Sequence, residues 1–138
     1  MGLPDPEVAR RCDELGRVLR ALGDLARAQV QFERALAIGE AALGADDPDV
    51  ASWRNSLGSV LHDLGDLAGA RVQFERALAI SEVVLGPDHP TMAVRRNNLG
   101  GVLRDLGDLA GARAQFERAL AIGEGVLGPD HPGRGHLA

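Results

Sequence analysis

The stretch LGDLAGARVQFERALAISE, from Leu64 to Glu82, decides the fold because it occurs three times. An earlier copy, LGDLARAQVQFERALAIGE, runs from Leu22 to Glu40, and a later one, LGDLAGARAQFERALAIGE, runs from Leu106 to Glu124. Successive copies are 42 residues apart. A period of this length is typical of stacked repeats, in which each unit is too small to bury its own apolar face and neighbouring units complete the core.

Aligning the copies on their prolines divides the single array into units 6–47, 48–89 and 90–131. The second and third units agree at 32 of 42 positions, which indicates recent duplication or deliberate idealisation. Residues 132–138 are either the truncated start of a fourth unit or a disordered tail.

Each unit is expected to form two helices, here described for the second unit. The first helix should run from about Pro48 to Leu64, because Asp47 can cap it and proline is favoured at a first helical position. Gly65 should end it, since glycine adopts the left-handed conformation that a helix terminus requires. The second helix should run from about Leu67 to Leu85, with apolar residues at three- and four-residue steps. The sequence therefore predicts an all-α fold of six helices.

Composition restricts the class of function. The net charge is −5, whereas nucleic-acid and membrane-surface binders are usually basic, so neither partner is expected. All fifteen basic residues are arginine, which indicates the codon bias of a GC-rich bacterial genome but also suits arginine-based recognition. Cys12 is the only cysteine, and neither a signal peptide nor a membrane-spanning stretch is visible, so a cytoplasmic location is expected.

The sequence offers no evident reaction centre. The pairs Asp88–His89 and Asp130–His131 could suggest acid–base chemistry, but they recur in phase at helix starts, where capping explains them. The histidines lack metal-binding spacing, and the absence of lysine excludes a phosphate-binding loop of the GxxxxGK[ST] type. No catalytic residue, metal or cofactor is predicted, and the chain is expected not to be an enzyme.

The repeated residues resemble the tetratricopeptide repeat (TPR) family. The 42-residue unit is similar to the kinesin-light-chain-like subclass, which is also found in bacterial signalling proteins. The residues that carry the resemblance are Leu57–Gly58, Leu61, Gly65, Ala70, Phe74, Arg76–Ile80, Glu82, Leu85–Gly86, Asp88–Pro90 and Asn97–Asn98. The resemblance implies a right-handed α-solenoid of three helix-turn-helix repeats, with the first helices lining a concave groove that binds peptides or partner segments.

The groove implied by the resemblance draws on all three first helices. Its expected lining is Arg10, Asp13, Arg17, Arg20, Ser52, Asn55, Ser59, His62, Val94, Asn97, Gly101 and Arg104. Asn55 and Asn97 occupy matching positions, where an amide can both donate to and accept from a ligand backbone. The positions that match the chaperone-tail clamp of the family hold Asp13, Arg17, Ser56, Val94 and Asn98, and this set does not form a clamp.

Trp53 is a candidate binding hot spot. Its equivalents in the other units are Arg11 and Arg95, which predicts a partly exposed position. The alternative interpretation is that Trp53 packs over the next helix and has no role in binding. Cys12, whose equivalents are Arg54 and Arg96, is expected to be accessible for the same reason.

The last helix, from about Leu109 to Leu127, keeps the apolar residues of the internal copies although no solubilising helix follows. Self-association, end to end or by exchange of a helix pair, is therefore predicted. The residues predicted to mediate it are Phe116, Leu120, Ile122 and Val126.

The leading functional hypothesis is a non-enzymatic interaction module that binds a peptide or partner segment. The groove arginines Arg10, Arg17, Arg20 and Arg104 suggest an acidic segment. One alternative is a self-assembling scaffold or idealised array, and another is the sensor fragment of a larger bacterial signalling ATPase or regulator.

Overall fold

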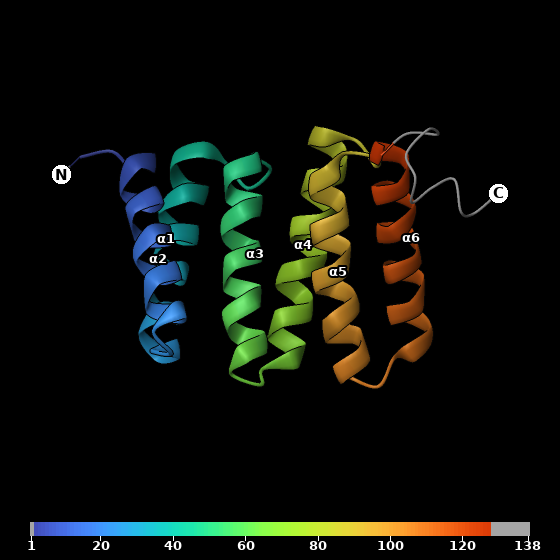
Figure 1. The fold of residues 1–138 in the computed structure, drawn as a ribbon. Coiled ribbons are helices and arrows are strands. Elements are labelled where there is room, and N and C mark those ends of the chain that lie inside the picture. The colour runs from blue at the N-terminus through green and yellow to red at the C-terminus, as the bar shows by residue number, and fades with distance from the viewer. Residues whose placement is uncertain (1, 128–138) are drawn as a thin grey trace.

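Six α-helices stand side by side in one row in the computed structural model (Figure 1), which describes residues 2–127 and side chains as far as residue 125. The helices are α1 (Pro6–Ala21), α2 (Leu25–Leu43), α3 (Pro48–Asp63), α4 (Leu67–Leu85), α5 (Pro90–Asp105) and α6 (Leu109–Leu127). Among the described residues there is no strand. The all-α repeat architecture is confirmed. The predicted tail 132–138, the pair Asp130–His131 and the side chain of Val126 lie outside the described part of the chain.

Each helix packs against the next one along the chain, and two further contacts join α1 to α3 and α3 to α5. The second helices α2, α4 and α6 make no such contacts with one another. The first helices therefore lie closer together than the second helices. The row curves accordingly, and α1, α3 and α5 line its inner side.

The helix boundaries follow from local chemistry. The carboxylates of Asp5 and Asp47 accept hydrogen bonds from backbone amides two residues later, at 2.9 and 2.8 Å. At the start of α5, Nδ1 of His89 accepts from the backbone amide of Thr91 at 3.1 Å and takes the same role. Gly65 follows α3 with a φ of +84°, as its helix-ending role requires.

Within each repeat, an aromatic ring packs directly on a glycine. A Cβ atom added to Gly16 would lie 2.6 Å from the ring of Phe32, and one added to Gly58 would lie 2.7 Å from the ring of Phe74. Both rings are buried. Because only a hydrogen atom fits between ring and backbone, these contacts fix how closely the two helices of a repeat approach.

Trp53 is buried, which corrects the expectation of partial exposure and agrees with the alternative that it packs against a neighbouring helix. Its side chain is 4% exposed and lies over Gly39 of the preceding repeat, where there is no side chain to obstruct it. The equivalent Arg95 is also buried, against Ser81. Arg11, at the equivalent position of the first repeat, is exposed. The presence of arginine at two equivalent positions therefore did not indicate exposure.

Cys12 is also buried, at 6% exposure, which corrects the expectation that it is accessible. Its equivalents Arg54 and Arg96 are buried as well, and each forms an ion pair with a glutamate of the preceding repeat, Glu40 or Glu82. A buried guanidinium is tolerated here because a carboxylate compensates its charge.

Candidate ligand-binding groove

Side-chain pairs link neighbouring first helices along the inner side of the row. Arg20 of α1 donates two hydrogen bonds to Asp63 of α3, at 2.5 and 3.2 Å. One repeat later, Nε2 of His62 lies 2.6 Å from a carboxylate oxygen of Asp105. Each link joins residues 43 positions apart, so the repeat period places both pairs at the same level of the groove.

Two polar links lie nearer the start of α3 and α5. The side-chain amide of Asn98 donates to Oδ1 of Asn55 at 3.0 Å, and Nη2 of Arg95 donates to the hydroxyl of Ser52 at 3.1 Å. The two asparagines therefore link the second and third repeats, and Asn55 also lines the hollow described next. In the first repeat Asp13 takes the position of Asn55, so the amide link is not repeated there.

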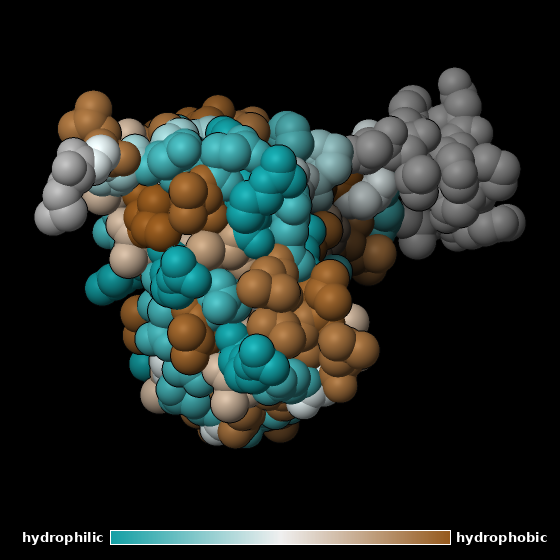
Figure 2. Space-filling view, turned by 90° about the vertical axis from the view of Figure 1, so that its left-hand side faces the viewer, coloured by the Kyte–Doolittle hydropathy of each residue, from teal (hydrophilic) through white to brown (hydrophobic). Residues whose placement is uncertain are grey.

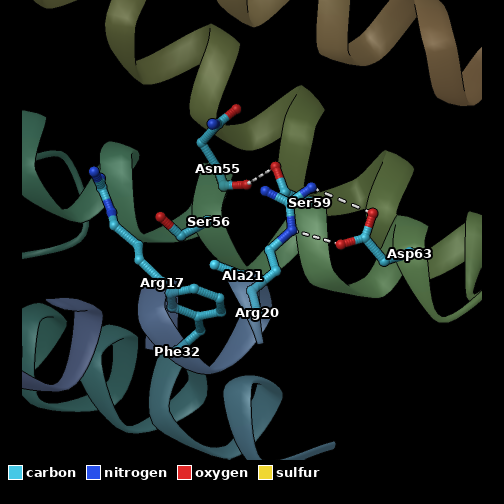
Figure 3. A pocket seen from close by; sticks show the side chains of 8 residues that line it. All are labelled: Arg17, Arg20, Ala21, Phe32, Asn55, Ser56, Ser59 and Asp63. Carbon is cyan, nitrogen blue, oxygen red and sulfur yellow. Dashed lines mark hydrogen bonds and ion pairs between the residues drawn. The ribbon is translucent and has the colours of Figure 1, made fainter. Parts of the chain in front are cut away.

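A hollow of about 510 Å³ opens between α1 and α3. Figure 3 shows its lining: Arg17, Arg20, Ala21, Phe32, Asn55, Ser56, Ser59 and Asp63. Four of these were predicted groove residues, namely Arg17, Arg20, Asn55 and Ser59. The hollow combines an apolar ring with amide, hydroxyl, guanidinium and carboxylate groups.

The other predicted groove residues lie elsewhere. Asn97 lines a second hollow at the α5–α6 end. Ser52 and His62 are occupied by links to α5, and Asp13 is buried. The hollow between α1 and α3 is therefore lined by only some of the residues that were predicted to line the groove.

The basic character expected for the groove is largely compensated. Each of the four predicted groove arginines lies within ion-pair distance of a carboxylate. The pairs are Arg10 with Glu7 and Asp49, Arg17 with Asp13, Arg20 with Asp63, and Arg104 with Asp105. Counting arginines in the sequence therefore overestimates the positive charge available to a ligand.

Arg95 is a buried arginine beside the predicted groove residue Ser52, and the sequence analysis did not single it out. It is 8% exposed and donates only to the hydroxyls of Ser52 and Ser81, with no carboxylate partner among the described residues. Burial, and then the positive charge of Arg17, lower the pKa of Arg95. The sequence did contain a sign of this contact, because Arg95 follows Ser52 by 43 residues, the separation that the other links between first helices share.

Asp13 is the one buried carboxylate of the groove. Burial raises its pKa, while the hydroxyl of Ser56 and the charge of Arg17 oppose the shift. Oδ2 of Asp13 lies 2.9 Å from Nε of Arg17, but Oδ1 is buried without a hydrogen-bond partner. Such an unsatisfied group costs about 1–3 kcal/mol.

Within the described residues, no cluster of three or more histidine, cysteine, aspartate or glutamate side chains could hold a metal ion. None of the helices described is long and apolar enough to cross a membrane.

A family model described as the tetratricopeptide repeat matches residues 9–82, 49–123 and 91–138. The chain belongs to the tetratricopeptide repeat family. TPR proteins are generally non-catalytic scaffolds and typically act as protein-interaction modules. A comparison with curated proteins finds no significant match.

Solved TPR structures share the fold. A kinesin-light-chain-like protein of nearly identical TPR-like repeats from Podosopora anserina is 24% identical, with a TM-score of 0.82, over 94% of this chain and 62% of that one. BtubC (BKLC) from P. vanneervenii is 29% identical, with a TM-score of 0.84, over 91% of this chain and 50% of that one. The first TPR of Spaghetti (RPAP3), bound to the HSP90 peptide SRMEEVD, is 16% identical, with a TM-score of 0.68, over 96% of this chain and 89% of that one. The chain thus spans between half and two thirds of the two kinesin-light-chain-like structures.

Proposed function

We propose that this TPR array binds an extended peptide segment of a partner protein along α1, α3 and α5. The observation that carries the proposal is the hollow of about 510 Å³ between α1 and α3. Its mixed lining suits a peptide, which presents backbone donors and acceptors together with side chains.

The amide of Asn55 is the expected backbone contact. Its Oδ1 accepts from Asn98, and this bond fixes the side chain so that Nδ2 can donate to a peptide carbonyl. Ser59 and the ring of Phe32 lie in the same hollow and offer a hydroxyl and an apolar surface. Fixing the amide before the ligand arrives reduces the conformational entropy lost on binding.

An acidic residue in the peptide is favoured by two arginines rather than by the four predicted ones. The side chain of Arg17 is 65% exposed and forms an ion pair with one carboxylate, that of Asp13. Arg95 has no carboxylate partner among the described residues, and its charge interacts with that of Arg17. A peptide carboxylate near these two arginines would supply the missing charge without breaking the pair of Arg20 and Asp63.

The test is a screen of the purified chain against a display library of random dodecapeptides, followed by fluorescence anisotropy with labelled copies of the enriched peptides. Enriched sequences should contain Asp or Glu. Asn55→Ala and Arg17→Ala should each weaken binding about tenfold, the effect of losing one hydrogen bond to a charged or desolvated group. Arg10→Ala is the control, because Arg10 lies on α1 outside the hollow.

Failure to enrich any peptide would contradict the proposed function. Enrichment of neutral peptides, with Arg17→Ala binding normally, would retain the groove but remove the preference for acidic ligands. The self-assembling alternative has a separate basis in the apolar ends of the row and does not depend on the groove.

A further inference from the structure

The two ends of the row present the two halves of the contact that joins one repeat to the next. We propose that copies of this chain stack head to tail, with α1 of one copy packing on α5 and α6 of another. In this arrangement, α1 of one copy would contact the third repeat of the other copy in the same way that α3 contacts the first repeat and α5 contacts the second within one chain. This inference goes beyond peptide binding, since it concerns surfaces outside the hollow between α1 and α3.

The α1 face carries apolar residues at the same positions as its internal equivalents, but in the described part of the chain they are exposed. Val8, Leu15 and Val18 are 41%, 48% and 57% exposed. The residues at the same positions are no more than 5% exposed. They are Val50, Leu57 and Val60 of α3, and Met92, Leu99 and Val102 of α5. Figure 2, which views the molecule from the α1–α2 end, shows hydrophobic patches on this face.

The α6 end provides the complementary surface. Leu120 is 63% exposed, whereas its equivalents Leu36 and Leu78 are 9% and 8% exposed beneath the repeat that follows them. A mainly apolar hollow of about 590 Å³ lies here, lined in part by Ala93, Phe116 and Leu120. Of the residues predicted for self-association, Phe116 and Leu120 are accessible, while Ile122 is only 8% exposed.

Two further positions at the α6 end are suited to residues of α1 from a second copy. Gly39 receives Trp53 and Ser81 receives Arg95 at the internal contacts, and Gly123 stands at the same position with open space above it. Gly123 would receive Arg11 of the second copy. Asn97 would face Glu14 of the second copy, as Asn55 faces Asn98, and its amide can donate to that carboxylate.

The junction should be weaker than an internal contact. Arg20 and His62 each reach an aspartate of the next repeat, but the corresponding position in a second copy is Ala21. Because the two contacting surfaces differ, the contact is heterologous, and in the register of the internal repeats each added copy lengthens the row. Assembly should therefore depend on concentration and produce a linear series rather than one defined oligomer.

The test is sedimentation velocity from about 1 µM to about 1 mM, a range that brackets weak and moderate affinities. The average mass should rise above the 14.5 kDa of one chain as concentration increases. Leu15→Glu blocks the α1 face and Leu120→Glu blocks the α6 end, and each variant alone should remain a monomer. Both leucines are exposed in the single chain, so neither substitution should unfold it. Circular dichroism checks the fold, with Val18→Glu as a substitute for Leu15→Glu.

Mixing the two blocked variants distinguishes this arrangement from other modes of association. Each variant keeps one intact end, so the mixture should form a dimer of about 29 kDa and nothing larger. Val83→Glu is the matched control, because Val83 is 87% exposed on α4, away from both ends, and should leave assembly unchanged. A wild-type chain that stays at 14.5 kDa throughout, or a mixture that forms no dimer, would overturn the proposal.

Discussion

Gly58 lies against the ring of Phe74, and this contact sets the approach of α3 to α4. A Cβ atom at Gly58 would lie 2.7 Å from the ring, which is buried and cannot move aside freely. Gly58→Ala should therefore lower the free energy of unfolding by about 1–3 kcal/mol, the usual cost of overpacking a core. Urea denaturation followed by circular dichroism measures the change.

Gly101→Ala is the matched control, because Gly101 is also within a first helix but has open surroundings. The nearest atom to its added Cβ is Cε1 of His62 at 3.8 Å, which is an ordinary contact distance. Alanine there should raise the free energy of unfolding by about 0.4–1 kcal/mol through its higher helix propensity. Equal effects of both substitutions would show that ring packing is not the cause.

Asp13 is the residue whose ionisation should oppose folding. Burial raises its pKa above the ordinary value of 3.8, so the folded chain holds this proton more tightly than the unfolded chain does. The contribution of Asp13 to the free energy of unfolding is therefore most favourable below pH 3.8, and it is lost as the pH rises through the folded-state pKa. Asp13→Asn, which copies the residue found in the other two repeats, should stabilise the chain at pH 7 by about 1 kcal/mol.

The gain from Asp13→Asn should shrink as the pH is lowered below the folded-state pKa of Asp13, and the contribution of its charge should vanish well below pH 3.8, where the wild-type carboxyl is protonated in both states. Thermal melts of both proteins between pH 3 and pH 7 measure this dependence. A gain that is independent of pH would mean that hydrogen bonding, not the charge, is responsible.

At the scale of elements, Trp53 joins α3 to the preceding repeat. Its ring is buried over Gly39, so Trp53→Ala should lower the free energy of unfolding by about 3–5 kcal/mol, as expected for truncating a buried aromatic residue. Denaturant unfolding measures the loss. Arg11→Ala is the control at the equivalent exposed position and should change stability by no more than about 0.5 kcal/mol. A loss of peptide affinity without a loss of stability would restore the hot-spot interpretation of Trp53.

Pairs of helices are also linked by buried arginines, which act differently according to their partners. Arg54 and Arg96 reach glutamates of the preceding repeat, whereas Arg95 reaches only serine hydroxyls. The first two therefore have a structural role as compensated charges. Arg95 has no carboxylate partner among the described residues, so its charge is not compensated in this way.

At the scale of the whole molecule, stability should be highest in the middle of the row. The second repeat has a neighbour on each side, whereas α1 leaves its apolar face exposed and Phe116 is less buried than Phe32 and Phe74. In a stacked array the stability of a unit includes the contacts with its neighbours. Native-state hydrogen exchange at low protein concentration should therefore be slowest in α3 and α4 and faster in α1 and α6.

Uniform protection of all six helices would instead mean that the row opens as one cooperative unit. If head-to-tail stacking occurs, raising the concentration should slow exchange selectively in α1, α5 and α6, because these helices form the junction. The Leu15→Glu variant should lack this concentration dependence and thereby separates stacking from intrinsic stability.

The repeat period and the approximate helix boundaries were predictable from the sequence. These features depend on local capping, backbone conformation and apolar spacing, which a unit of 42 residues carries within itself. The candidate groove was predictable only in outline. Arg17, Arg20, Asn55 and Ser59 of the predicted set line one hollow, but the compensation of the arginines by carboxylates was not visible in the sequence.

By itself, the sequence determined an all-α array of three helical hairpins and the polar and apolar character of each position. Only the tertiary structure decided which of those positions are buried. Leu15 and Leu57 occupy the same place in their repeats, yet one is 48% exposed and the other 5%. The same is true of Arg11 and Arg95. The reason is physical: in a stacked array, burial and charge compensation come from the neighbouring unit, and an end position has a neighbour on one side only.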